Sequence, residues 1–251
     1  MGVDLGFSKT RDTTGIACLD GDQLHLCRAG TQWENRKERI PLGFQPSVIA
    51  LDGPVLPRGA DERIRRQCEF VFSYAPFWNR CKPGLSHWGF GLEMRRAATE
   101  ACSQFSKILP DSAKAMRRTF PVCCHAIVEA FPNAFLAVLL PEGELHGAPK
   151  LRRGCRFDWL YERAFRANRL TTVLSVELDL PAQVWDRLIS EDDHELRAAL
   201  VCLLTAAFVA HGSASKIGDA ETGWFWLPPF SLWQDWAKEG LDRATAKWRL
   251  K

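Results

Sequence analysis

Residues 1–30, MGVDLGFSKTRDTTGIACLDGDQLHLCRAG, contain three short apolar runs that are separated by turn residues. The first run, GVDLG, ends at a glycine, and the runs TTGIACLD and QLHLCRAG flank the turn residues Asp20, Gly21 and Asp22. Short apolar runs joined by Gly and Asp turns are typical of neighbouring antiparallel strands. The stretch therefore predicts a three-stranded antiparallel meander at the start of the chain.

Strand patterns and helix patterns alternate in the rest of the chain. Apolar residues at helical spacing predict helices within residues 61–72 and 97–109, and residues 195–211, which are apolar nearly all round, predict a buried helix packed on the sheet. Apolar and β-branched runs predict strands at SVIALDGP (47–54), at CCHAIVEAF (123–131), which leads into a helix from Pro132, and at GWFWLPP (223–229), an edge or end strand. This order predicts an α/β fold with a mixed sheet, in which the antiparallel meander continues into parallel strands and helices cover both faces.

The length of the chain, 251 residues, favours one domain over two. We expect residues 1–251 to form a single domain with inserted loops around residues 74–91 and 141–156 and a Trp-rich C-terminal tail. Ten Trp and fifteen Phe supply enough large apolar side chains for one extended core.

Composition excludes several classes of protein. The 33 basic and 30 acidic residues leave a net charge of +3, which is too balanced for binding nucleic acid through overall charge, so any such site must be a local patch. The chain has no signal-like start and no long apolar run, which predicts a cytoplasmic protein without a membrane partner. The nine cysteines include no C-x-x-C pair, and we expect them to be reduced and structural. No feature of the sequence indicates an oligomeric state.

Acidic residues recur where the predicted strands end or a helix begins. They are Asp4, Asp52, Glu129 and the cluster Asp192, Asp193 and Glu195. A carboxylate in a buried strand is costly unless a cation or hydrogen bonds accompany it, and a divalent ion would meet that need. Simpler explanations are a turn cap at Asp4, an Asx turn at Asp52 and helix capping by the cluster. Their recurrence at one edge of the sheet nevertheless favours a shared site.

The order of several fragments resembles a known family. GVDLG with TTGIA, IALDGPVLPRG, the R-x-C-E of residues 66–69, IVEAFPNA, ALVCLLTA and GDAETGWFWLP follow one another as in the predicted ribonuclease H-like nuclease family (domain of unknown function 429). The resemblance spans residues 2 to 229 and implies a ribonuclease H-like sheet in which Asp4, Asp52 and Glu129 match the acidic positions. One position departs, because Ala198 stands where the last helix of the family carries an Asp. Glu195, one helical turn earlier, could substitute.

Together these features predict a nuclease that hydrolyses phosphodiester bonds of nucleic acid with Mg²⁺ or Mn²⁺. Two ions about 4 Å apart would activate a water and stabilise the leaving oxygen. The predicted catalytic residues are Asp4, Asp52, Glu129 and Glu195, and the predicted metal ligands are Asp4, Asp52, Glu129, Asp193 and Glu195. Basic residues predicted to bind the substrate are Lys9, Arg66, Arg80, Lys82, Lys150, Arg152 and Arg153.

Two other functions fit the sequence. A ribonuclease H-like module that is catalytically weak or inactive could bind nucleic acid or a protein partner, and Ala198 supports this alternative. An actin-like ATPase or kinase is suggested by DLGFSKT followed by TTGIA, which resembles a phosphate-binding hairpin, but such proteins need a second copy of it. Neither DNA nor RNA is favoured as the substrate.

Overall fold

The computed structural model describes residues 1–8, 10–57, 59–110, 126–146 and 155–250. In these ranges the chain forms one mixed sheet of seven strands in the order β3-β2-β1-β4-β5-β7-β6. The strands are β1 (Gly2–Asp4), β2 (Thr14–Asp20), β3 (Gln23–Ala29), β4 (Val48–Asp52), β5 (Ala126–Ala130), β6 (Ser215–Asp219) and β7 (Gly223–Leu227). Strands β1, β2 and β3 are antiparallel, and β1, β4, β5 and β7 are parallel. The predicted α/β mixed sheet, meander included, is confirmed.

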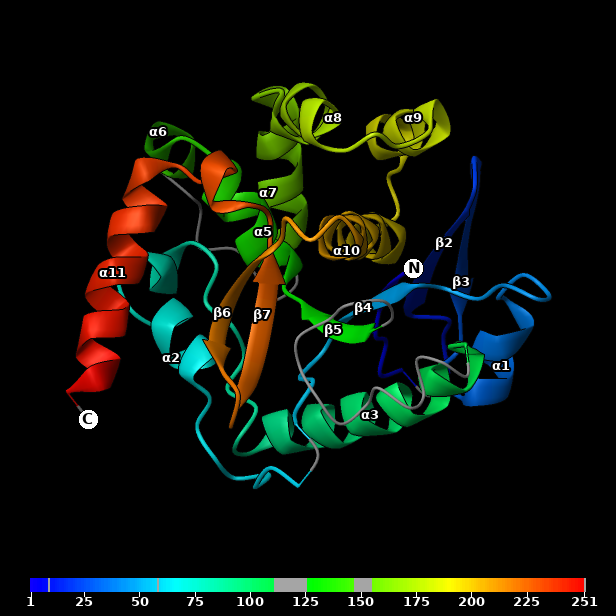
Figure 1. The fold of residues 1–251 in the computed structure, drawn as a ribbon, viewed down its shortest axis with the longest axis horizontal. Helices are drawn as coiled ribbons and strands as arrows, with labels where there is room; N and C mark the ends of the chain where they lie inside the picture. Colours follow the sequence, from blue (N-terminus) through cyan, green and yellow to red (C-terminus); the bar gives the residue numbers. More distant parts are fainter. Residues whose placement is uncertain (9, 58, 111–125, 147–154, 251) are drawn as a thin grey trace.

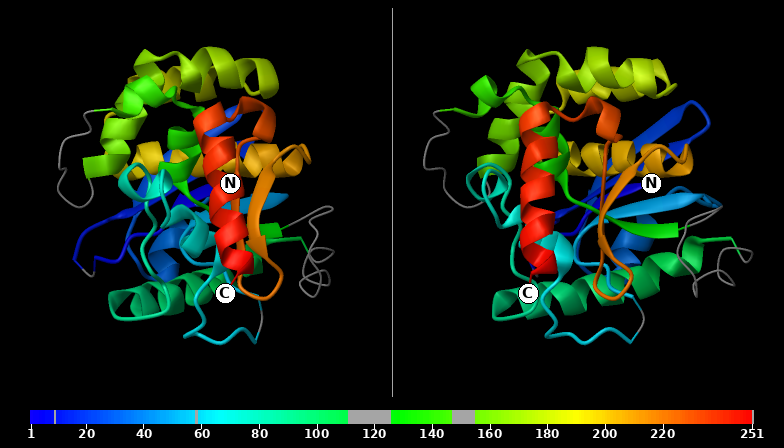
Figure 2. Two further views of the ribbon diagram at one scale, coloured as in Figure 1. Left: turned by 90° about the vertical axis from the view of Figure 1, so that its left-hand side faces the viewer. Right: turned by 60° about the vertical axis from the view of Figure 1, so that its left-hand side comes forward.

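Helices cover both faces of this sheet (Figure 1). They are α1 (Trp33–Glu38), α2 (Gln67–Phe72), α3 (Phe90–Phe105), α5 (Pro132–Leu139), α6 (Glu142–Leu145), α7 (Cys155–Arg166), α8 (Leu174–Glu177), α9 (Ala182–Ser190), α10 (His194–Ala210) and α11 (Asp235–Arg249). Helix α3 runs along one face, and α10 crosses the other, with α7, α8 and α9 beyond it (Figures 1 and 2). Helix α2 packs against β6 and β7 at the far end of the sheet, and α11 packs on α2. No helix in the described ranges is long and apolar enough to cross a membrane.

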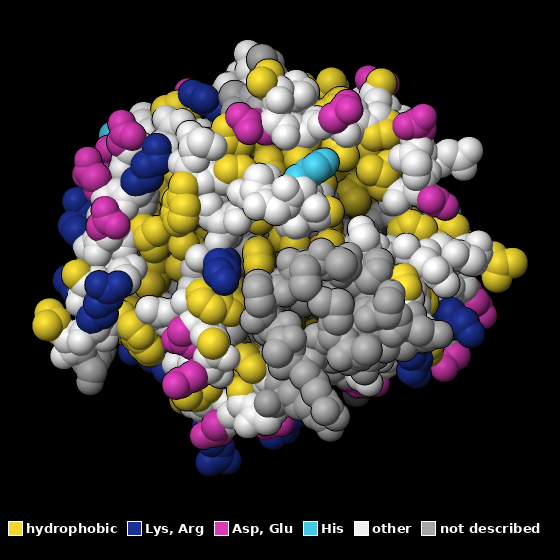
Figure 3. All heavy atoms as spheres, in the orientation of Figure 1, with side chains coloured by type: hydrophobic (Ala, Val, Ile, Leu, Met, Phe, Trp, Pro, Cys, Tyr) yellow, Lys and Arg dark blue, Asp and Glu magenta, His cyan; other side chains and the backbone are white. Residues whose placement is uncertain are grey.

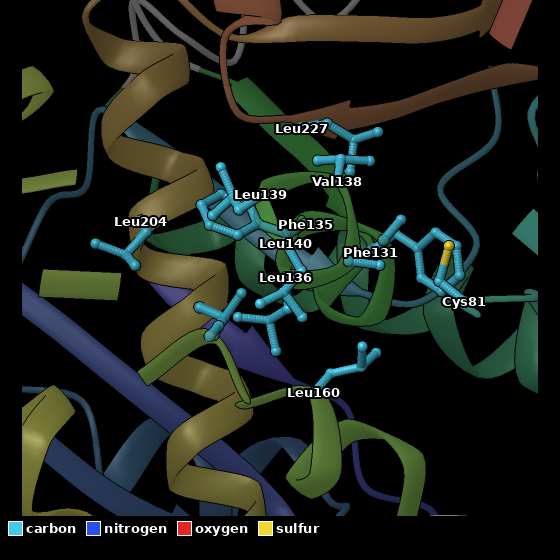
Figure 4. Packing of buried hydrophobic residues seen from close by; sticks show 14 of the residues in the cluster. Cys81, Phe131, Phe135, Leu136, Val138, Leu139, Leu140, Leu160, Leu204 and Leu227 are labelled. Atoms are coloured by element: carbon cyan, nitrogen blue, oxygen red, sulfur yellow. The ribbon is translucent and has the colours of Figure 1, made fainter. Parts of the chain in front are cut away.

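Side chains alternate between the two faces of the sheet along each strand, so each face has its own hydrophobic core. Val3 and Leu51 pack against Ala98, Ala101 and Phe105 of α3. Residues one position away point to the opposite face, so that Ala50 and Val128 pack against Cys202 and Ala206 of α10. The largest cluster lies on this second side around α5, where Phe135 and Leu136 meet Leu160 of α7 and Leu204 of α10 (Figure 4).

Two glycines let α10 lie directly on the sheet. A Cβ at Gly2 would come within 2.1 Å of the amide nitrogen of Leu203, and one at Gly15 within 2.0 Å of the carbonyl oxygen of Glu195. Because Gly15 is the register partner of Asp4, the first turn of α10 lies over the end of β1. The glycines therefore decide how close this helix comes to the acidic end of the strand.

This packing gives a direct test. A Gly15→Ala variant should lose about 1–3 kcal/mol of stability, because its methyl group has no space beneath α10. Urea unfolding measures the loss, with Gly143→Ala in α6 as the control, since a Cβ there would meet nothing within 4 Å. Equal stability of the two variants would mean that α10 does not lie against β1 in solution.

The structure corrects three details of the predicted elements. The strand GWFWLPP is not at the edge, because β7 lies between β5 and the short polar strand β6, which the pattern did not indicate. The Trp-rich tail contains the helix α11, whose Trp236 is buried. Helix α2 begins at Gln67, and residues 61–66 before it form a turn and loop.

Candidate functional site

Asp4 and Asp52 lie side by side at the ends of two adjacent parallel strands. They are register partners on β1 and β4, so both side chains point to the face that α10 covers. Neighbouring strands are roughly 4.8 Å apart, which places the two carboxyl groups next to each other. The structure thus brings together the two strand acids that the sequence pattern singled out.

The surroundings of Asp4 and Asp52 disfavour a negative charge on both carboxyl groups at once. Burial raises the pKa of Asp4 well above its usual value, and the neighbouring Asp52 and Glu195 raise it further. Burial likewise raises the pKa of Asp52 to about 7, with His194 acting in the opposite direction. Among the described residues, neither carboxylate accepts a hydrogen bond from a Lys or Arg side chain. The pair is therefore short of positive charge.

The start of α10 brings further acids close to this pair. Asp193 caps the helix by accepting a hydrogen bond from the amide of Leu196 at 3.1 Å, as the capping explanation predicts. Arg28 of β3 binds Asp193 at 3.0 Å and Glu195 at 3.5 Å. Both acids influence the pKa of Asp4, but each already has a partner in Arg28. Ala198 is buried one turn further along the helix.

His194 is a site residue that the sequence pattern did not reveal. Its Nδ1 lies 2.9 Å from the carboxylate of Asp158 in α7, and this hydrogen bond raises the pKa of the histidine. In turn His194 lowers the pKa of both Asp4 and Asp52, as a positive neighbour does. The signal for it in the sequence is its position between Asp193 and Glu195, two residues of the predicted acidic cluster.

Glu129 does not join Asp4 and Asp52. It is the register partner of Leu51, one residue out of phase with Asp52, and its side chain points to the face that α3 covers. Arg66 holds it in a fork, with Nη1 2.9 Å from Oε1 and Nη2 2.5 Å from Oε2, and the amide of Val55 donates to Oε2 at 2.8 Å. Burial raises the pKa of Glu129, and the Arg66 fork opposes that rise. In this structure Glu129 is half of a buried ion pair.

The same ion pair belongs to a wider buried network. Arg66 also donates to Glu69 at 3.4 Å and to the carbonyl oxygen of Thr222 at 2.9 Å. Glu69 accepts from the amide and the hydroxyl of Ser86, and that hydroxyl accepts from Arg95. Each of the four charged side chains, Arg66, Glu69, Arg95 and Glu129, is less than 5% exposed. The network fixes the loop of residues 82–89 against β5 and α3.

The basic residues predicted to bind the substrate lie in different environments. Arg66 is fully buried in the network, and Arg80 binds Glu142 at 2.5 Å and stacks on Trp236, so neither presents a free guanidinium. Lys82 is exposed and lines a cavity beside Asp52. Lys9, Lys150, Arg152 and Arg153 lie outside the described residues. On the face shown in Figure 3, basic and acidic side chains are mixed around the periphery.

The cavity that Lys82 lines has a volume of ≈ 410 Å³ and lies at the carboxyl ends of β4 and β5. Its walls come from residues 52–54, 82–86, 88–91 and 129–131, together with Glu69, Met94 and Phe225. Asp52 belongs to this wall as well as to the acidic pair. The carboxyl ends of parallel strands are a usual place for ligands in α/β proteins, and the candidate site therefore comprises the acidic pair and this cavity.

Comparison with protein-family models, curated proteins and solved structures finds no match to this chain. The ribonuclease H-like family therefore stays a prediction that rests on the sequence fragments quoted above.

Proposed function

We propose that this protein is a divalent-metal-dependent phosphodiesterase that acts on nucleic acid. One observation carries the proposal: Asp4 and Asp52 are adjacent, largely buried and without a Lys or Arg partner among the described residues, at the carboxyl end of the parallel strands. A pair of this kind costs free energy in the absence of a cation. Its presence at the edge where α/β proteins usually bind ligands favours a function for the pair.

The donor set fits a hard divalent cation. In the described part of the chain, no three or more Asp, Glu, His or Cys side chains are arranged to hold a metal ion. Mg²⁺ is nevertheless commonly bound by only one or two carboxylates, with waters and substrate phosphate completing its octahedral shell. Asp4 and Asp52 would hold such an ion, and Glu195 would have to leave Arg28 in order to join them. The proposal therefore requires one ion. The predicted second ion would need carboxylates that are paired with arginines in this structure.

The roles of the residues follow from their positions. When bound, the cation supplies a Lewis acid that lowers the pKa of a water and stabilises charge on the phosphate oxygens. Asp4 and Asp52 would hold it at the ends of two paired strands, and the paired His194 and Asp158 fix the adjacent start of α10. Lys82 at the cavity rim offers a positive charge to a phosphate of the bound strand.

A cleavage screen tests the proposal. The full chain is incubated with Mn²⁺ or Mg²⁺ and with single-stranded, duplex, hybrid and junction DNA and RNA, and calorimetry measures metal binding. We expect cleavage of at least one substrate in Mn²⁺ and none in EDTA, with binding of at least one ion. Absence of both cleavage and metal binding would refute the metal-dependent function.

A second candidate function is a binding module without catalysis. Arg28 occupies the acids at the start of α10, and Ala198 gives no carboxylate to the site. If an Arg28→Ala variant cleaves no substrate but the protein binds nucleic acid in EDTA, the binding module is the better description. If Arg28→Ala increases the affinity for Mn²⁺, Glu195 is freed as a ligand and the enzyme is favoured.

A further inference from the structure

The cavity beside Asp52 has an aromatic mouth. Trp88 is 69% exposed and Phe90 is 52% exposed, and both line the cavity. Gly89 between them has a φ of 56°, in the left-handed region that favours glycine, and this reversal of the chain presents both rings at the start of α3. Large exposed aromatic side chains that cluster at a cavity are typical of a contact surface.

This aromatic surface extends toward the acidic pair. Phe7 lies three residues beyond Asp4 and meets Phe90 edge to face, with their ring centroids 6.5 Å apart. Asp52 lines the same cavity and is also a member of the acidic pair. A ring that stacks at the cavity mouth would therefore lie next to the two carboxylates.

The polar groups of the cavity complement a nucleotide. Lys82 is exposed at the rim, and among the described residues it has no ion pair, so its charge is available to a phosphate. The carboxylates of Glu69 and Glu129 line the interior and retain acceptor capacity beyond the bonds they make, because each carboxylate has about four lone-pair sites. Those oxygens can accept hydrogen bonds from the amino or imino groups of a base. The remaining lining is mainly apolar, and its volume is within the range of about 300–1,000 Å³ for small-ligand sites.

We propose that this cavity receives a nucleobase of the bound nucleic-acid strand, which stacks on Trp88 and Phe90. Lys82 binds an adjacent phosphate, and the neighbouring phosphodiester is thereby presented to Asp4 and Asp52. This inference rests on the proposed function, because it assumes a nucleic-acid ligand. It adds which residues bind a base and a phosphate of the strand. Stacking of this kind tolerates every base, because each base has a π-face.

The test compares two fluorescent oligomers of eight residues that carry the same phosphates, oligo(dT) and an abasic strand. Fluorescence anisotropy in EDTA measures their affinities, because no metal-dependent cleavage then competes. One stacked base contributes roughly a 5- to 150-fold gain in affinity, so wild-type protein should prefer oligo(dT) by a factor in this range. Trp88→Ala should reduce the preference to about twofold or less. The control is Trp78→Ala, a tryptophan of similar exposure, 57%, that does not line the cavity.

Equal affinity of wild-type protein for the two strands, or binding of neither, would overturn the inference. So would a preference that survives Trp88→Ala, or one that Trp78→Ala removes equally. The outcome is independent of catalysis: a preference for bases without any Mn²⁺-dependent cleavage supports the cavity and refutes the nuclease, and cleavage without a preference for bases does the reverse.

Discussion

An Asp4→Asn variant should lose Mn²⁺-dependent cleavage by about a thousandfold, because one of two ligands of the cation is removed and several kcal/mol of transition-state stabilisation go with it. Asn keeps the size and shape of Asp but not its charge. Single-turnover cleavage rates of whichever substrate the wild-type protein cuts measure the loss.

The same variant should be more stable than the wild-type protein without metal. Burial and the neighbouring Asp52 raise the pKa of Asp4, so at high pH the metal-free folded protein must either bury a second charge or bind a proton that the unfolded chain does not bind. Asp4→Asn removes one charge of the pair, and we expect a gain of about 1–3 kcal/mol in the free energy of unfolding. Gain of stability with loss of function is the signature of a strained functional site.

The sign of the pH dependence follows from the raised pKa of Asp52. Its pKa is about 7 in the folded protein, whereas the ordinary pKa of an exposed aspartate, as in the unfolded chain, is 3.8. Between these values the folded state binds more protons than the unfolded state, so the stability of the metal-free protein falls as the pH rises from 4 to 7 and stays low above it. Burial raises the pKa of Asp4 in the same direction. The gain in stability from Asp4→Asn should therefore be larger at pH 8 than at pH 5.

Asp12→Asn is a suitable control, because Asp12 is exposed on the connection between β1 and β2 and does not contribute to the pKa of Asp4. It should change neither the cleavage rate nor the stability by a measurable amount. An Asp4→Asn protein that cleaves at the wild-type rate would remove Asp4 from the chemistry, and one that is destabilised at pH 8 would show that the pair is satisfied by other groups.

Sequence reasoning predicted the sheet because its signals were local. The turns around Gly6 and Gly21 and the short apolar runs of residues 1–30 indicate the meander without reference to the rest of the chain. The strand β6 was missed because SKIGD is short and polar, and its pairing with β7 is a tertiary contact. The meander, which depends on local patterns, was therefore predicted correctly. The edge position of GWFWLPP, which depends on the pairing of β6 with β7, was predicted wrongly.

The same distinction applies to the candidate site. Asp4 and Asp52 each end an apolar strand, and this position placed them at one edge of the sheet. Glu129 carried the same signal, but the register of β5 decides which face it points to, and a shift of one residue reverses that face. Its partner Arg66 is 63 residues away in the chain, and nothing in the local pattern pairs them.

A large loss of stability is also expected when the ion pair between Arg66 and Glu129 is broken. Arg66→Met should destabilise the protein by about 3–5 kcal/mol, because it leaves the carboxyl group of Glu129 buried without its fork. Such a loss is a large share of the roughly 5–15 kcal/mol that stabilise a folded domain. Urea unfolding in EDTA measures it. Arg96→Met is the matched control, since Arg96 pairs with Glu62 at the surface, and it should cost less than about 1 kcal/mol.

The double variant Arg66→Met with Glu129→Gln separates a structural role of Glu129 from a metal-binding one. If Glu129 serves only the ion pair, removing its charge should recover part of the stability lost in Arg66→Met, and the two substitutions should show a favourable coupling in a double-mutant cycle. Mn²⁺ should then stabilise the single and the double variant equally, since Asp4 and Asp52 are intact in both. A stabilisation by Mn²⁺ that is much larger in Arg66→Met would instead mean that the released Glu129 binds the ion, and the predicted three-acid site would be regained. The two outcomes differ because a carboxylate that has lost its arginine must find another cation or be protonated, and only one of these responses depends on the metal.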